Sequence, residues 1–174
     1  GGKASVTLAS GTTAIFYTII NICAHGDEVV SSPSLYGGTS TMFKDILPQF
    51  GITVRFAKTN DPAEFEKLIN CNTRMIFTET VSNPTLDLVD VEALAAIASR
   101  HHIPLVVDST FTPPCLFKPI DFGADVVIHS LTKWIGGHGT VLGGVAIDAG
   151  KFDWTDPKFS LYNQPDSSYH DLRY

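Results

Sequence analysis

The sequence predicts one α/β domain built on a mostly parallel β-sheet with helices on both faces. Short runs rich in β-branched residues alternate along the chain with stretches of helical periodicity. Polar residues follow the carboxyl ends of these runs, where open α/β sheets bind their ligands. A length of 174 residues, of which 44% are hydrophobic, is sufficient for one well-buried core.

The composition argues against several classes of partner. The net charge is −6 and the basic residues form no stripe, so a nucleic-acid-binding surface is not expected. No apolar run approaches the roughly 20 residues that span a bilayer, and the start does not resemble a signal peptide. Cys23, Cys71 and Cys115 lie far apart without a C-x-x-C pair. We therefore expect reduced thiols and a cytoplasmic protein.

The first predicted helix runs from Ser10 to Ala24. Serine, glycine and threonine suit its N-terminus, and isoleucines recur at helical spacing after them. Unpaired, partly positive N–H groups of Gly11 and Thr12 are expected at its start and could hold a phosphate group. The alternative is a plain N-cap on a buried helix.

In the next segment, residues 28–56, the sequence predicts a strand, a loop, a helix and a second strand. The strand at Glu28–Ser31 is followed by a loop that carries Tyr36 and two glycines. A helix is expected from Thr39 to Leu47, stopped by Pro48, and a strand from Ile52 to Phe56. Tyr36 in such a loop is either a packing residue or a ring that lies over a flat ligand.

A further helix is predicted to begin at the dipeptide Asp61–Pro62. Aspartate suits the N-cap, and proline suits the first helical position. Phe65, Leu68 and Ile69 form its expected buried stripe.

The centre of the chain again alternates strand, helix and strand. The first strand covers Arg74–Glu79, and Asn83 lies in the following loop, where asparagine before proline also favours a plain turn. Asp90 is predicted to cap a helix with one apolar face. The strand Pro104–Val107 then leads directly into Asp108. The Asp108 carboxylate is suited either to pair with a cationic ligand atom or to cap a turn.

The last two strands are predicted at Gly123–His129 and Leu142–Ile147, with a glycine-rich segment between them. Ser130, Thr132 and Lys133 follow the end of the first of these strands. The two hydroxyl groups can bind an anion such as phosphate, and a lysine in a partly dry site becomes a nucleophilic amine. The alternative is a solvated loop with an ordinary surface lysine.

Loops at the carboxyl end of the predicted sheet thus bring these polar and aromatic side chains together. One ligand, pyridoxal 5′-phosphate (PLP), can interact with all of them. Its aldehyde reacts with a lysine amine, its protonated ring nitrogen needs an acid partner, its phosphate needs donors, and its ring needs a stacking surface. The chain has no dinucleotide-binding, phosphate-loop or hydrolase-elbow motif, and no metal is expected from the spacing of its histidines. His129 and His138, which flank the lysine, are expected to be structural or to support residues of the site rather than to bind a metal. The candidate residues are Gly11, Thr12, Tyr36, Asn83, Asp108, Ser130, Thr132 and Lys133.

Five motifs, ASGTTA, SLYGGT, SNPTLDLVD, VVDSTF and SLTKWIGGHG, occur in this order. Together they resemble the Cys/Met-metabolism family of PLP-dependent enzymes, whose large domain has fold type I. The resemblance covers essentially the whole chain. It implies that Lys133 forms a Schiff base with PLP, that Asp108 pairs with the pyridine nitrogen and that Tyr36 stacks on the ring. It also implies that the phosphate is held by Gly11, Thr12, Ser130 and Thr132, and that Asn83 contacts O3′ or the substrate.

Within the family, KWIGGHGT and the later SYH segment resemble the branch that exchanges the acetate of O-acetylhomoserine for sulfide. We therefore expect a PLP-dependent transferase of methionine biosynthesis that forms homocysteine, or methionine from a thiol, with Lys133, Asp108 and Tyr36 as catalytic residues. Gly38 stands where methionine γ-lyases have a cysteine, whereas Asp171 replaces a glycine that the sulfhydrylase branch has. The alternatives are a cystathionine or methionine γ-lyase of the same family, and a PLP-binding chain without turnover.

Family subunits are more than twice as long as this chain. We therefore expect residues 1–174 to be the central PLP-binding domain of a longer subunit. The resemblance implies that the arginine for the substrate carboxylate, and a Tyr/Arg pair that reaches the neighbouring subunit's phosphate, lie outside these residues. It implies an amino-acid substrate and sulfide as small-molecule partners, and a homotetramer arranged as a dimer of dimers.

Overall fold

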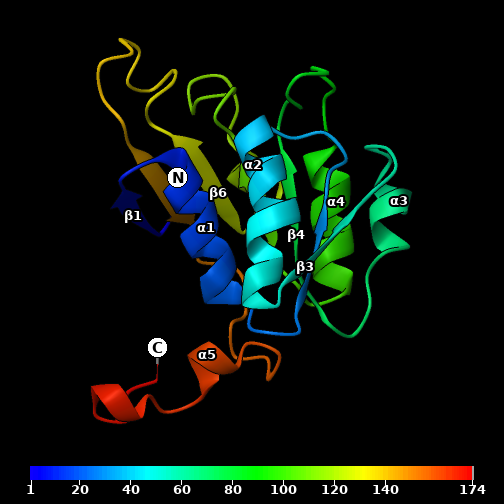
Figure 1. Cartoon of the computed structure of the whole chain (residues 1–174), viewed down its shortest axis with the longest axis vertical. Coiled ribbons are helices and arrows are strands. Elements are labelled where there is room, and N and C mark those ends of the chain that lie inside the picture. The colour runs from blue at the N-terminus through cyan, green and yellow to red at the C-terminus, as the bar shows by residue number, and fades with distance from the viewer. Residues whose placement is uncertain (174) are drawn as a thin grey trace.

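A computed structural model describes residues 1–173 and confirms the predicted α/β architecture (Figure 1). Its seven-stranded sheet has the order β1-β7-β6-β5-β4-β2-β3. Neighbouring strands from β3 to β6 are parallel, whereas β7 is antiparallel to both β6 and β1. The strands are β1 (Ala4–Leu8), β2 (Glu28–Ser31), β3 (Thr53–Phe56), β4 (Thr73–Glu79), β5 (Leu105–Asp108), β6 (Val126–Ser130) and β7 (Gly144–Asp148).

Helices cover both faces of the sheet because the central strands are apolar on both sides. The helix α1 (Gly11–Ile22) and a helical segment that begins with α2 (Gly37–Thr41) pack on one face. The helices α3 (Pro62–Glu66) and α4 (Val91–Arg100) pack on the other. On the first face, the buried rings of Phe43 and Phe77 meet edge to face with their centroids 5.0 Å apart.

The three predicted N-caps are confirmed. The side chain of Ser10 accepts a hydrogen bond from the Thr13 amide, and those of Asp61 and Asp90 accept from amides in the first turns of α3 and α4. Each cap satisfies a backbone donor that has no partner inside its own helix. Local residue chemistry therefore sets where these helices begin.

Two predicted helices have different bounds from those expected. The helix expected at Thr39–Leu47 begins at Gly37, and its helical path continues through a π-helical turn into a 3-10 turn at Leu47–Phe50. Pro48 does not stop it, because proline is tolerated in the first turn of a new helical segment, where its missing N–H is not needed. The helix α3 ends at Glu66, so Leu68 and Ile69 pack against the core from the turns after it.

The strand β1 and the C-terminal elements were not predicted. β1 pairs with β7 at the edge of the sheet, and four of its five residues are exposed, so it lacks the apolar run that marks the inner strands. The helix α5 (Ser160–Asn163) and a 3-10 turn at Ser167–Tyr169 lie below the sheet in Figure 1, away from the carboxyl ends of β4, β5 and β6. Phe159 is buried there against Phe152 and Trp154.

The strand β6 begins three residues later than expected, because Gly123 forms a left-handed turn and the Asp125 side chain accepts from the Leu105 amide before β6 starts. The strand β7 begins two residues later than expected, at Gly144. Among residues 1–173, no helix is both long and apolar enough to cross a bilayer. The three cysteines are free, with Cys23 buried and the other two exposed.

Candidate functional site

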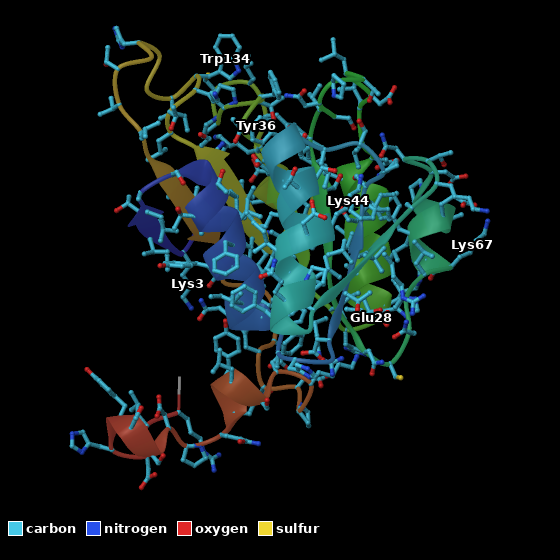
Figure 2. All side chains as sticks on the ribbon, viewed as in Figure 1. Lys3, Glu28, Tyr36, Lys44, Lys67 and Trp134 are labelled. Atoms are coloured by element: carbon cyan, nitrogen blue, oxygen red, sulfur yellow. The ribbon has the colours of Figure 1, made fainter. Side chains whose placement is uncertain are left out.

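A cavity of about 570 Å³ opens at the carboxyl end of the parallel strands. All eight candidate residues line it, although they come from loops spread over the chain between positions 11 and 133. Figure 2 shows Tyr36 and Trp134, which both line this cavity, at the end of the molecule opposite to Glu28 at the start of β2. The structure therefore brings the predicted residues together at the expected end of the sheet.

The N-terminus of α1 lies in direct contact with the end of β6. A Cβ atom at Gly11 would lie 2.6 Å from the Ser130 Cβ atom, so a side chain there would separate the two elements. A Cβ atom at Gly144 would lie 2.0 Å from the carbonyl oxygen of Ser10, which again requires a glycine. The two glycines let the first-turn N–H groups of α1 approach the Ser130 hydroxyl. This set of donors is suited to bind an anion, and we refer to it as the anion site.

The segment after β6 is held by backbone turns and by Thr132. The Thr132 hydroxyl accepts from the Gly143 amide at 3.1 Å and donates to the carbonyl oxygen of the same residue at 3.3 Å. These bonds join the two ends of the glycine-rich loop between β6 and β7. Lys133 lies on this segment and lines the cavity, but it is exposed rather than held in the partly dry site that was expected, because the segment itself is exposed.

Asp108 ends β5 at the cavity and is half-buried. Burial raises the pKa of this carboxyl group, and two hydrogen bonds from Thr110 act in the opposite direction. The Thr110 amide and hydroxyl both donate to Oδ1, at 2.9 and 2.5 Å, so Oδ2 has no hydrogen-bond partner among the described residues. A half-buried carboxyl group with one free oxygen is suited to a cationic partner in the cavity.

Thr110 connects this acid to the anion site. Its hydroxyl donates to Asp108 and accepts from the backbone amide of Ser130 at 2.8 Å. The ends of β5 and β6 are thereby held together by one side chain. Sequence reasoning did not identify this residue, because a threonine two positions after a strand is common in loops.

Glu79 is a second carboxyl group in the cavity that sequence reasoning did not select. It ends β4 in register with Asp108 on β5, is 5% exposed, and accepts from the Tyr36 amide at 2.7 Å. Burial raises its pKa to about 8; the Tyr36 hydrogen bond opposes this effect, and the nearby Asp108 adds to it. Its position in the sequence could have identified it, because two neighbouring parallel strands that both end in an acidic residue place the two carboxyl groups side by side.

Tyr36 and Asn83 lie on loops at the same end of the sheet. Tyr36 is the N-cap residue of α2, and its ring is half exposed at the cavity. Asn83 follows β4 and precedes a cis proline. Its backbone carbonyl oxygen accepts a long hydrogen bond from the Ser34 hydroxyl at 3.5 Å. The two histidines near Lys133 do not line the cavity: His129 is buried with Nδ1 bonded to the Ser109 carbonyl oxygen, and His138 is exposed.

This donor set fits PLP. The cavity combines an anion site, a carboxyl group with a free oxygen, a primary amine and an exposed aromatic ring, which match the phosphate, the ring nitrogen, the aldehyde and the flat ring of the cofactor. The fold and the site together assign the chain to the class of PLP-dependent enzymes with fold type I.

Comparisons with known proteins make this class more specific. The family model for Cys/Met metabolism PLP-dependent enzymes matches residues 1–166, and the chain belongs to this family. It is 44% identical over 174 residues to the O-acetyl-L-homoserine sulfhydrylase of Leptospira meyeri, covering 100% of this chain and 39% of that protein. It is 45% identical over 177 residues to the homocysteine/cysteine synthase of Saccharomyces cerevisiae, covering 100% of this chain and 40% of that one.

Solved structures agree with this assignment. A crystal structure from Campylobacter jejuni that contains N′-pyridoxyl-lysine-5′-monophosphate superposes with a TM-score of 0.96 at 39% identity, covering 99% of this chain and 43% of that one. The O-acetylhomoserine sulfhydrylase of Wolinella succinogenes has a TM-score of 0.85 at 40% identity, covering 93% and 47%. The chain spans about two fifths of the length of the curated relatives named above.

Proposed function

We propose that residues 1–174 form the central PLP-binding domain of an enzyme that converts O-acetylhomoserine and sulfide into homocysteine and acetate. The observation that carries this proposal is the cavity in which Lys133, Asp108 and the anion site of α1 meet. The similarity to sulfhydrylases over the whole chain supports the choice of substrate.

Each group of the cofactor has a candidate partner in the cavity. The Lys133 amine is the attachment point for the aldehyde, and Asp108 Oδ2 is the partner for the ring nitrogen. Gly11, Thr12 and Ser130 supply donors for the phosphate. The Thr132 hydroxyl already contacts Gly143, and it can turn its proton to the phosphate while it still accepts from the Gly143 amide. In this proposal the Tyr36 ring supplies the stacking surface, and Asn83 contacts O3′ or the substrate.

When bound, PLP supplies a ring that withdraws electrons from the carbon next to the substrate amine. The protein residues then have three tasks. Asp108 keeps the ring nitrogen protonated, because an ionised, half-buried carboxyl group favours a cation beside it. Lys133 Nζ moves protons at the Cα and Cβ atoms of the substrate, and the Tyr36 hydroxyl is the second acid–base group. Acetate leaves from Cγ, and sulfide takes its place.

The same proposal includes the partners, the assembly and the cellular location of the enzyme. Its partners are an amino-acid substrate and sulfide, and its subunits assemble as homo-oligomers around the cofactor. Large apolar side chains at the rim of the cavity support assembly, because Trp134 is 62% exposed and Leu142 is 76% exposed. Free cysteines are consistent with a reducing cytoplasm.

Borohydride reduction after incubation with PLP tests the cofactor site. Peptide mapping should place the pyridoxyl group on Lys133, and Lys133→Ala should abolish the label. Lys118 and Lys151, which do not line the cavity, are the internal controls. A label on either of these lysines in place of Lys133 would contradict the assignment.

A sulfide-dependent assay on the full-length subunit tests the reaction. Homocysteine should form from O-acetylhomoserine only when sulfide is present. Release of a keto acid and ammonia from cystathionine or methionine, without sulfide, would instead indicate a lyase of the same family. Binding of PLP without either reaction would indicate a chain that lacks turnover.

A further inference from the structure

The backbone of Tyr36 is tied to the sheet by a residue that has no place in the proposed reaction. The Tyr36 amide donates to Glu79 Oε1 at 2.7 Å, across 43 positions of sequence. Tyr36 begins α2 without a side-chain cap of its own, so this bond is what links the start of α2 to the end of β4. Because Glu79 is 5% exposed, water competes little for the bond.

The ring of Tyr36 is positioned by a second residue. A Cβ atom at Gly38 would lie 2.7 Å from Cε1 of the Tyr36 ring and 3.4 Å from its Cδ1 atom. The ring therefore lies directly against the bare backbone of Gly38, and any side chain there would push it away. The preceding residue, Gly37, has the opposite surroundings, because a Cβ atom there would have no neighbour within 4 Å.

We propose that Glu79 and Gly38 are positioning residues that together hold the Tyr36 ring in one place over the cavity. Glu79 fixes the backbone amide, and the absence of a side chain at Gly38 fixes how the ring packs. Neither residue needs to touch the cofactor for this role; both act through Tyr36. The inference rests on the proposed function in so far as the ring is what stacks on PLP.

Hydrogen exchange at the Tyr36 amide tests the Glu79 contact directly, on the chain without cofactor. Glu79→Leu replaces the acceptor by an apolar side chain of similar size. Hydrogen exchange at the Tyr36 amide should then become about tenfold faster or more. Glu79→Gln keeps an acceptor oxygen and should restore protection to within about threefold of the wild type. Exchange at Tyr36 that is equal in the wild type and in Glu79→Leu would overturn this part of the proposal.

Thr73→Val is the matched control for this experiment. Thr73 is a buried residue at the other end of β4, and its hydroxyl accepts from the Asn70 amide at 3.0 Å. The substitution removes a buried hydrogen bond from the same strand without reaching Tyr36. Exchange at Tyr36 should therefore stay within about twofold of the wild type, even where the chain as a whole is less stable.

Fluorine NMR of the chain labelled with 3-fluorotyrosine tests the Gly38 contact. The chain has five tyrosines, and Tyr36→Phe identifies the resonance of interest. That resonance should move in Gly38→Ala and stay in place in Gly37→Ala, although both substitutions add one methyl group to the same turn. An identical spectrum for the two alanine variants would overturn the role of Gly38.

A PLP titration of the same samples separates this inference from the proposed function. Gly38→Ala and Glu79→Leu should weaken PLP binding by about tenfold, and Gly37→Ala and Glu79→Gln by less than about threefold. If the wild-type chain and its variants all fail to bind PLP, the proposed function fails while the exchange and NMR results still decide the positioning role. Equal, measurable affinities in all four variants would contradict the link between Tyr36 and the cofactor.

Discussion

Replacing Glu79 by glutamine should change how the stability of the chain depends on pH. Glu79 is almost completely buried at the end of β4, and burial raises its pKa to about 8 from an ordinary value of 4.5. Asp108 and Lys133 are the other charged residues that line the same cavity. Glutamine has the shape of the protonated acid and keeps an acceptor for the Tyr36 amide, so the substitution removes the titration with little change in packing.

The sign and the size of the effect follow from this pKa. Because the pKa is higher in the folded state than in the unfolded state, the proton on Glu79 stabilises the fold. That contribution is fully present below about pH 4.5 and is lost as the pH rises through about 8. The difference of 3.5 pH units between 4.5 and 8, at about 1.36 kcal/mol per unit, sets an upper limit of roughly 5 kcal/mol.

Urea unfolding of the wild type and of Glu79→Gln at several pH values measures this effect. The free energy of unfolding of the variant, relative to the wild type, should rise by about 2 to 5 kcal/mol between pH 5 and pH 9. Glu92→Gln, at an exposed position in the first turn of α4, controls for the loss of one acidic side chain. A difference between Glu79→Gln and the wild type that stays constant over this range would refute the reasoning.

Three further predictions concern the cofactor, the packing of α1 and assembly. Asp108→Asn in the full-length subunit should still bind PLP but lose turnover by about 100-fold or more, because an amide does not keep the ring nitrogen protonated; a near-native rate would exclude this role. Gly144→Ala should lower the free energy of unfolding by about 1–3 kcal/mol in urea, because its Cβ atom would overlap the Ser10 carbonyl oxygen, whereas Gly37→Ala should not. The chain should self-associate through its exposed apolar rim and catalyse poorly on its own; sedimentation at several concentrations together with a sulfide-dependent assay would reveal a fully active monomer if this is wrong.

Local sequence chemistry was sufficient for most of the fold. The inner strands each contain a short apolar run, and Ser10, Asp61 and Asp90 mark helix starts by side-chain chemistry that acts over two or three residues. β1 could not be found in this way, because it is a mostly exposed edge strand whose partner, β7, lies at the other end of the chain. Edge strands carry little of the hydrophobic signal on which such predictions depend.

In the candidate site too, residues marked by their position in the sequence were predicted, whereas residues that matter through three-dimensional contacts were not. All eight predicted residues line one cavity, because each ends a strand, follows the carboxyl end of a strand or lies at the start of a helix there. Glu79 and Thr110 were missed, since their importance lies in contacts with Tyr36 and Ser130 that are set by the three-dimensional arrangement of the loops. The exposure of Lys133 was also not predictable from its spacing, because it depends on what covers the segment after β6.

The pairing of β1 with β7 has a consequence for how the protein is made. Residues 4–8 find their strand partner at residues 144–148, and the start of α1 packs against Ser130 and Gly144. A ribosome adds about 5–20 residues per second, so these N-terminal residues wait on the order of ten seconds or more for their partners to be translated. During that interval the apolar face of α1 has no sheet to cover it in full. The strand β1 and the start of α1 therefore complete their packing only after the residues of β7 have been added to the growing chain.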